Sequence, residues 1–132
     1  MIARASSCVG DSWNHAMFKI KYCHKVFAIN VVRAYVLELI YLVSTLHNMP
    51  VKKIGFDDDH VHLYVNIRLR SKPEAAKLFK GITGKKVFEQ FPEIKRKYFW
   101  DSGFWNPSYW MNNVGANEQE TEDYIMNQKY SY

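Results

Sequence analysis

Apolar residues recur along this chain with two different periods, and together they predict alternating strands and helices. Residues 17–22 alternate between apolar and polar side chains, as a half-buried strand does. From 31 to 47, apolar residues at positions 32, 35, 36, 39, 40, 43 and 46 form the one-sided stripe of a packed helix. Two further short strands are predicted over 51–56 and 60–69, with a turn of three aspartates between them.

The second half of the chain continues the pattern. Pro73 suits the first turn of a helix that reaches about residue 82, Gly84 is expected to break it, and a second helical stretch covers 85–91. A strand over 104–114, interrupted by a proline, is expected at a sheet edge or a bulge. With a last helix near the end of the chain, the order β-α-β-β-α-(α)-β-α favours an α+β fold, a ferredoxin-like antiparallel sheet with helices packed on one face.

Composition is consistent with one folded domain. The chain has 132 residues, of which 48% are apolar and 16% aromatic. We expect residues 1–13 to form a loose N-terminal tail and residues 14–132 to form the single domain. The apolar run over 26–43 is too often interrupted by polar residues to span a membrane, and two cysteines make no disulfide framework, so we expect a cytoplasmic protein.

Charge is distributed unevenly along the chain. The net charge is +5, while residues 51–100 hold 12 Lys and Arg against 6 Asp and Glu. A basic central segment suits either a polyanionic partner such as nucleic acid or a solvated basic surface. Candidates for DNA binding are the basic residues of the stretch 77–97, namely Lys77, Lys80, Lys85, Lys86, Lys95, Arg96 and Lys97, the last three of which adjoin the aromatic residues of 98–110. Phe104, Trp105 and Trp110 are better assigned to the core or to a subunit interface.

The strand over 60–69 carries the most informative motif. His60 and His62 are two residues apart, so both imidazoles point to one face while the intervening apolar residues point to the other. Two imidazoles side by side suit a divalent metal, although two packed or surface histidines would give the same pattern. Asp59 could orient an imidazole by a hydrogen bond. A histidine triad is disfavoured because Tyr64 occupies the next alternate position.

The last helix carries a second candidate pair. Asn117 and Glu120 have the spacing of a capping box at its start. Tyr124 and Gln128 are four residues apart and would share a helix face, which could place a nucleophile and a neutral oxygen ligand at one metal. The alternatives are a tyrosine packed at the helix surface and a solvated glutamine. Two later tyrosines are expected in a fraying end.

Three segments, 59–63, 98–109 and 124–128, resemble the TnpA-type transposases of the smallest insertion sequences in order and spacing. These enzymes belong to the superfamily of histidine-hydrophobic-histidine (HUH) endonucleases and use one catalytic tyrosine. The resemblance covers roughly residues 14 to 129. The histidine motif alone is widely shared, whereas its combination with Tyr-x-x-x-Gln is specific.

The resemblance implies a mechanism. His60, His62 and Gln128 would hold Mg²⁺ or Mn²⁺, and Tyr124 would attack single-stranded DNA to give a 5′-phosphotyrosine and a free 3′-hydroxyl. It also implies DNA hairpins as partners and a homodimer in which the sheet extends across the subunits and the tyrosine helix of one completes the site of the other. The family often has two glycines before this helix, where this chain has Gly115-Ala116.

Two other functions are compatible with the sequence. One is an inactive or domesticated relative that binds DNA hairpins without cutting them. The other is an HUH nickase that cuts without transposing. A replication initiator is disfavoured because the chain has room for no helicase domain.

Overall fold

The computed structural model describes residues 10–132, which form a five-stranded antiparallel sheet in the order β4-β1-β3-β2-β5. The strands are β1 (Trp13–Lys19), β2 (Val51–Phe56), β3 (His60–Asn66), β4 (Trp110–Asn113) and β5 (Tyr130–Ser131). The helices are η1 (Lys21–Cys23), η2 (Val26–Ala28), α2 (Asn30–Leu46), α3 (Lys72–Gln90), α4 (Pro92–Ile94), η3 (Lys95–Phe99) and α5 (Glu118–Met126). The predicted ferredoxin-like α+β fold is confirmed.

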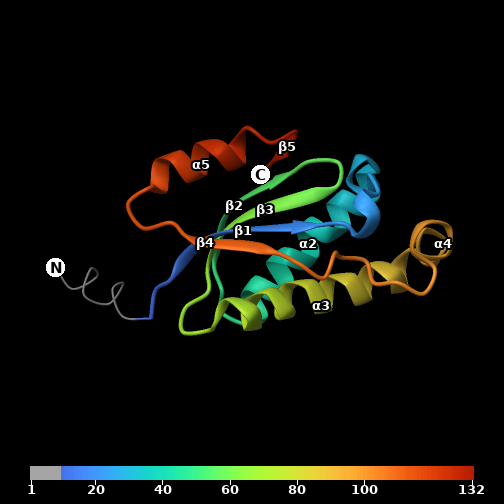
Figure 1. Cartoon of the computed structure of the whole chain (residues 1–132), viewed down its shortest axis with the longest axis horizontal. Coiled ribbons are helices and arrows are strands. Elements are labelled where there is room, and N and C mark those ends of the chain that lie inside the picture. Colours follow the sequence, from blue (N-terminus) through green and yellow to red (C-terminus); the bar gives the residue numbers. More distant parts are fainter. Residues whose placement is uncertain (1–9) are drawn as a thin grey trace.

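The helices lie on two sides of the sheet. Figure 1 shows α2 and α3 against one face and α5 across the other. The main core lies between the sheet and α2 and α3, and it takes one alternate set of β3 side chains, Val61, Leu63 and Val65, together with Ile67 just after the strand. A second, small cluster on the opposite face joins Tyr64 and Ile125, and thus holds α5 on the sheet. Helices therefore cover both faces, not one.

Helix α3 corrects the expected break at Gly84. It is continuous from Lys72 to Gln90 and starts with a capping box, in which the Ser71 hydroxyl accepts a hydrogen bond from the Glu74 backbone N–H at 3.2 Å. Gly84 serves close packing: a Cβ built there would meet Trp105 Cδ1 at 3.4 Å. The glycine therefore reflects the approach of the 103–109 segment and not the end of a helix.

The strand expected over 104–114 is much shorter than predicted. Only β4 pairs continuously with β1, and Trp105 adds one isolated bridge to Ile20. Between them the chain bulges around Pro107, and Lys80 Nζ donates to the backbone carbonyl of Asn106 at 2.7 Å. As predicted for this segment, β4 is an edge strand of the sheet.

The C-terminal end also differs from expectation. Helix α5 ends at Met126, and Asn117 makes no side-chain cap, so the predicted capping box is wrong. The last tyrosines are not frayed, because β5 pairs with β2 and the Arg33 guanidinium lies 3.6 Å from the centre of the Tyr130 ring. Lys129 pairs with Asp58 at 3.1 Å. The chain after α5 is thus tied to the sheet.

The predicted loose tail falls mainly on residues 1–9, which lie outside the described residues. Within residues 10–13, the Ser12 backbone N–H donates to Asn66 Oδ1 at 2.9 Å and Trp13 begins β1. None of the helices in residues 10–132 has the length and apolar character that crossing a bilayer requires.

The two glycines inside α3 give a test of this packing. Gly84→Leu should lower the free energy of unfolding by about 1 to 3 kcal/mol, because its Cβ would already contact Trp105 Cδ1 at 3.4 Å and the three further carbons would have to be fitted against this packed segment. Gly81→Ala is the matched control: a Cβ there meets nothing within 4 Å, so it should raise stability by about 0.5 to 1 kcal/mol through helix propensity alone. Urea unfolding measures both. Equal effects at the two positions would contradict the continuous, closely packed helix.

Candidate active site

The outer face of the sheet is organised by the pairing of β1 with β3. In this antiparallel register Met17 lies opposite His62 and His15 lies opposite Tyr64. Directly opposed residues of antiparallel strands point to the same face. The face that carries the two predicted histidines therefore also carries His15, which comes from a different strand.

His15 is the functional-site residue that sequence reasoning missed. Its Nε2 lies 2.9 Å from Nδ1 of His62, and the two ring centroids are 5.0 Å apart. The predicted first strand began at residue 17, whereas β1 begins at Trp13. Extending the alternation upstream would have put His15 on the same face as Met17.

The predicted histidine pair lies together on β3. The rings of His60 and His62 are 5.0 Å apart, and His62 is buried, with 5% of its surface exposed. His60 Nδ1 lies 2.8 Å from Asp59 Oδ1, so the carboxylate accepts from the imidazole as the candidate orienting role of Asp59 requires. Since Nδ1 of each imidazole is already engaged, the Nε2 atoms remain to bind a ligand.

Gly55 brings the end of α5 down onto this face. It lies directly opposite His62 on β2. A Cβ at Gly55 would stand 2.3 Å from the backbone oxygen of Ile125 and 2.8 Å from Cγ of Gln128, so only glycine lets the chain pass this close. Gln128 lies beyond the end of α5, and its amide nitrogen donates to the Tyr124 carbonyl at 3.3 Å. Its stem is thus held beside the cross-strand neighbour of His62.

Tyr124 stands over His15 and His62 from the last turn of α5. Its ring centroid is 5.3 Å from that of His62 and 5.6 Å from that of His15, and 54% of its surface is exposed. The three side chains border a cleft of ≈ 580 Å³ that is closed on the β4 side by Trp110. The structure therefore brings Tyr124 and His62 together in one chain, with room for a substrate beside them.

Burial shapes the protonation of this site. It lowers the pKa of His62 to about 3, with the neighbouring charges of His15 and His60 acting in the same direction. Burial also lowers the pKa of His15. Both imidazoles are therefore neutral at neutral pH, which is the form that a metal ligand needs.

The three predicted ligands could bind a metal only if water or substrate supplied further ligands. Among residues 10–132, His, Cys, Asp and Glu side chains form no group of three or more poised for a metal. His60, His62 and Gln128 offer two imidazole nitrogens and one amide oxygen. Mg²⁺ and Mn²⁺ commonly complete such a partial set with water and phosphate oxygens.

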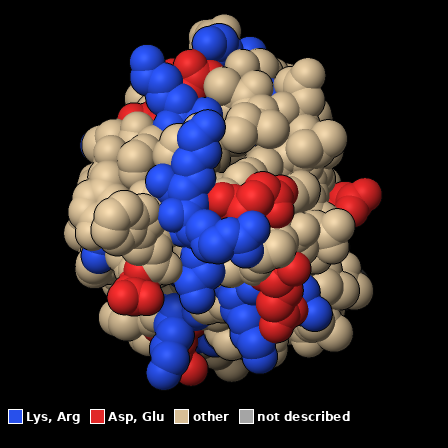
Figure 2. Space-filling model, turned by 90° about the vertical axis from the view of Figure 1, so that its right-hand side faces the viewer, with Lys and Arg blue, Asp and Glu red and all other residues tan. Residues whose placement is uncertain are grey.

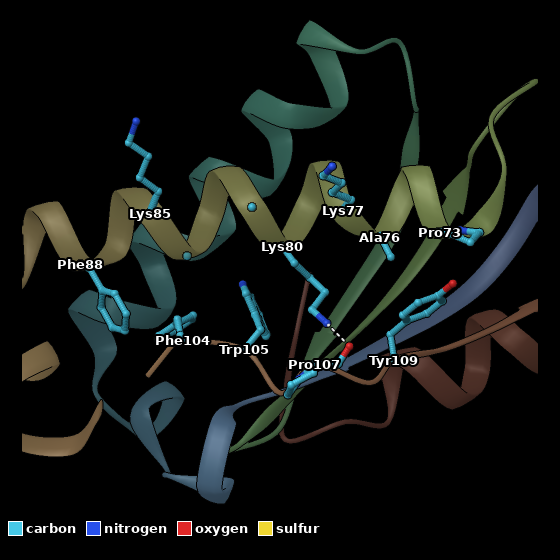
Figure 3. Close-up of a pocket in the computed structure, with 13 residues that line it drawn as sticks. Pro73, Ala76, Lys77, Lys80, Lys85, Phe88, Phe104, Trp105, Pro107 and Tyr109 are labelled. Carbon is cyan, nitrogen blue, oxygen red and sulfur yellow. Dashed lines mark hydrogen bonds between the residues drawn. The ribbon is translucent and has the colours of Figure 1, made fainter. Parts of the chain in front are cut away.

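The candidate DNA-binding lysines lie away from this cleft. Figure 3 shows a groove between α3 and the 103–109 segment, in which Lys80 reaches down to backbone carbonyls while Lys85 extends away from the groove. Lys80 Nζ contacts the carbonyl oxygens of residues 106, 107 and 108, and burial lowers its pKa. In this structure Lys80 fixes the segment before β4. Lys77, Lys85 and Lys86 are exposed on α3.

A second basic surface lies at the end of the molecule formed by α4 and η3. Figure 2 shows a band of basic side chains running down this end. Lys95, Arg96 and Lys97 are exposed on η3, followed directly by Trp100, which is 74% exposed. Phe99, Phe104 and Trp105 are buried in the core, as expected for the last two, whereas Trp110 is 41% exposed.

A ferredoxin-like sheet with an alternating histidine pair on its central strand, beside a tyrosine on a C-terminal helix, defines an HUH-type single-tyrosine enzyme. The sequence profile described as "Transposase IS200 like" matches residues 8–128. The chain belongs to this family, the TnpA-type transposases that act on single-stranded DNA.

Individual relatives agree with this assignment. The ISDra2 transposase TnpA of Deinococcus radiodurans is 27% identical over 116 residues, which cover 86% of this chain and 81% of the relative. The transposase of insertion sequence IS200 from Salmonella typhimurium is 28% identical over 120 residues, covering 88% and 78%.

Two solved structures share the fold. The crystal structure of a transposase from Deinococcus radiodurans has a TM-score of 0.72 at 25% identity and covers 91% of this chain and 92% of its own. A REP-associated tyrosine transposase bound to a REP hairpin has a TM-score of 0.60 at 14% identity and covers 90% and 67%.

The lowered pKa of His62 predicts how stability depends on pH. The unfolded chain binds a proton near pH 6.5, whereas folded His62 binds one only near pH 3. Stability from this site is therefore complete above pH 6.5 and is lost as the pH falls toward 3. In metal-free protein, His62→Leu should flatten the fall in urea midpoint between pH 6.5 and 4. His47→Leu, outside the site, is the control. An unchanged slope in His62→Leu would mean that His62 titrates normally.

Proposed function

We propose that this chain cleaves and rejoins single-stranded DNA at the ends of an insertion sequence, with Tyr124 as the nucleophile and His60, His62 and Gln128 as ligands of Mg²⁺ or Mn²⁺. The observation that carries the proposal is the edge-to-face contact of the Tyr124 and His62 rings, with centroids 5.3 Å apart, at the border of an open cleft. Family membership accounts for transposition, and the geometry supports this choice of residues.

Each step of the proposed reaction exchanges one phosphoester bond for another. The Tyr124 oxygen forms a bond to phosphorus while the bond from phosphorus to the 3′ oxygen breaks, and the phenolic proton is released as the 3′ oxygen gains one. A cation at the histidines would neutralise charge on the scissile phosphate. The products are a 5′-phosphotyrosine and a free 3′-hydroxyl. That hydroxyl can attack another such linkage, so strands rejoin without a high-energy cofactor.

Basic surfaces outside the cleft would bind the DNA. The relative with known bound DNA holds a hairpin, and we propose that hairpins at the element ends bind here as well. Lys77, Lys85 and Lys86 on α3 supply one row of charge. Lys95, Arg96 and Lys97 lie next to the exposed Trp100, an arrangement that suits single-stranded DNA because bases stack on aromatic rings beside phosphate contacts.

We further propose a homodimer whose sheet continues across the subunits. Strand β4 pairs with β1 along one edge, and its other edge can pair with a second copy. Exchange of α5 between subunits would release little packing of the helix itself, because it buries only Ile125 completely and Gly115 before it adopts φ +57. It would also have to move β5, which pairs with β2 in this chain. Lys52 joins α5 by ion pairs to Glu118 and Glu122, and exposed pairs of this kind are weak.

Tyr124→Phe tests the nucleophile. The variant should bind single-stranded hairpin DNA like the parent and form no covalent adduct with it, because the attacking oxygen is gone. Denaturing gels with end-labelled DNA measure the adduct. Tyr130→Phe and Tyr132→Phe should still form adducts, and EDTA should prevent adducts in every protein. An adduct that persists in Tyr124→Phe would show that another residue is the nucleophile.

The same assay separates the alternative functions. A parent protein that binds without any adduct would be an inactive relative, and one that cuts without rejoining would be a nickase.

Charge removal on α3 tests the DNA surface. The double variant Lys85→Gln with Lys86→Gln should weaken hairpin binding and reduce the slope of log affinity against log salt by about 2, since each lost phosphate contact removes about one released counterion. Lys80→Met is the contrast on the same helix: it should lower stability and leave the slope unchanged, because its ammonium already contacts three carbonyls. Equal slopes in the parent and the double variant would place the DNA elsewhere.

Mixed dimers test the exchange of α5. His60→Ala protein and Tyr124→Phe protein are each expected to be inactive. If α5 docks on the partner, a mixed dimer contains one intact site and cleavage returns after subunit exchange. Mass spectrometry verifies that mixed dimers form. Continued inactivity of verified mixed dimers would show that each site works within one chain, in the arrangement that this structure describes.

A further inference from the structure

We propose that His15 is a positioning residue for His62, which holds the His62 imidazole in the tautomer and orientation that leave Nε2 free for a metal ion. The inference rests on the proposed function, because it concerns how His62 acts as a ligand. His15 lies outside the His60-Val61-His62 motif and reaches it only through the fold.

The contact is made across two strands. Met17 is the direct neighbour of His62, and His15 lies one alternate position further along β1. Diagonal neighbours of this kind lie about 7 to 8 Å apart, with their Cβ atoms somewhat closer, and two long side chains can close this gap. Here the gap is closed by the 2.9 Å contact between His15 Nε2 and His62 Nδ1.

The His15 ring is itself held in place. Trp110 on β4 meets it edge to face, with ring centroids 4.8 Å apart and an interplanar angle of 87°. His15 is thus fixed from the β4 side and contacts His62 on the β3 side. Trp110, His15 and His62 lie on the neighbouring strands β4, β1 and β3, so the pairing of these strands determines where the His62 ring lies.

The direction of the hydrogen bond decides whether His62 can be a ligand. A neutral imidazole carries one proton. If that proton is on Nδ1 of His62 and is donated to His15 Nε2, then Nε2 of His62 keeps its lone pair. The reverse direction would leave the proton of His62 on Nε2 and block coordination. A ligand role for His62 therefore requires an acceptor atom at His15.

The His60 imidazole is also oriented by a hydrogen bond at Nδ1, but its partner is a carboxylate. Its Nδ1 donates to Asp59 Oδ1 at 2.8 Å, which also leaves Nε2 unprotonated. Partners of this kind fix the orientation of metal-binding histidines, and their loss typically lowers metal affinity about 10- to 100-fold. One orienting group is adjacent in sequence, and the other is supplied by β1. His15 is less suited to be a third ligand, because its Nε2 already faces His62.

The test uses the affinity of the DNA-free protein for Mn²⁺, followed by the electron paramagnetic resonance signal of free Mn²⁺. His15→Leu keeps a bulky side chain and removes the acceptor nitrogen, so the affinity for Mn²⁺ should fall about 10-fold or more. His15→Gln places an amide oxygen near the position of Nε2 and should recover affinity to within about threefold of the parent. His47→Leu, a histidine replaced outside the site, should leave affinity unchanged. A residue that only filled space would be replaced equally well by leucine.

A spectroscopic readout separates positioning from packing. Long-range ¹H–¹⁵N correlation spectra of the metal-free parent should show His62 protonated on Nδ1, and His15→Leu should show mixed or Nε2 protonation. An Nε2-protonated His62 in the parent would overturn the proposal whatever the variants do, even if one of them fails to fold. Parent-like Mn²⁺ affinity in folded His15→Leu would also overturn it.

His60→Ala distinguishes this failure from failure of the proposed function. If His60→Ala loses Mn²⁺ affinity and His15→Leu does not, only the role of His15 is wrong. If neither variant loses affinity, the metal site itself is wrong, and the proposal falls with it.

Discussion

The antiparallel register between β1 and β3 is the constraint on which the rest of this site depends. Because side chains alternate along a strand, a shift of one residue would turn His60 and His62 into the core and Val61 into the cleft. The register is held by the burial of Val61, Leu63 and Val65 under α2 and α3. The apolar face of β3 thus positions the histidine face, and both come from one run of alternating residues.

The outer face of the central strand combines burial with polar chemistry. His62 is almost completely buried although it is polar, and this burial lowers its pKa and keeps it neutral at neutral pH. Buried polar groups need hydrogen-bond partners, and these come from Asp59 for His60 and from His15 for His62. Orientation, protonation state and burial are therefore three consequences of the same packing.

Helix α5 is held on this face mainly by close packing over Gly55. Gly55 removes the side chain that would block Ile125 and Gln128, and Ile125 is the one completely buried residue of α5. The stronger ties lie beyond the helix, where β5 pairs with β2 and Arg33 stacks on Tyr130. The helix thus presents Tyr124 to the cleft although Ile125 is its one completely buried residue.

The sequence by itself determined the fold class, the helix over α2, the strands β2 and β3, and the shared face of His60 and His62, because these features depend on periodicity within short segments. It also pointed to Tyr124, Gln128 and the family through motif spacing. Only the tertiary structure decided that α3 continues through Gly84, that residues 104–109 bulge away from the sheet, and that α5 ends before Gln128. These features depend on Trp105, Lys80 and Gly55 meeting residues far away in the chain. His15 shows the limit most clearly, because its contact with His62 depends on the register between β1 and β3. The alternation of residues within β1 does not show which residue of β3 lies beside His15.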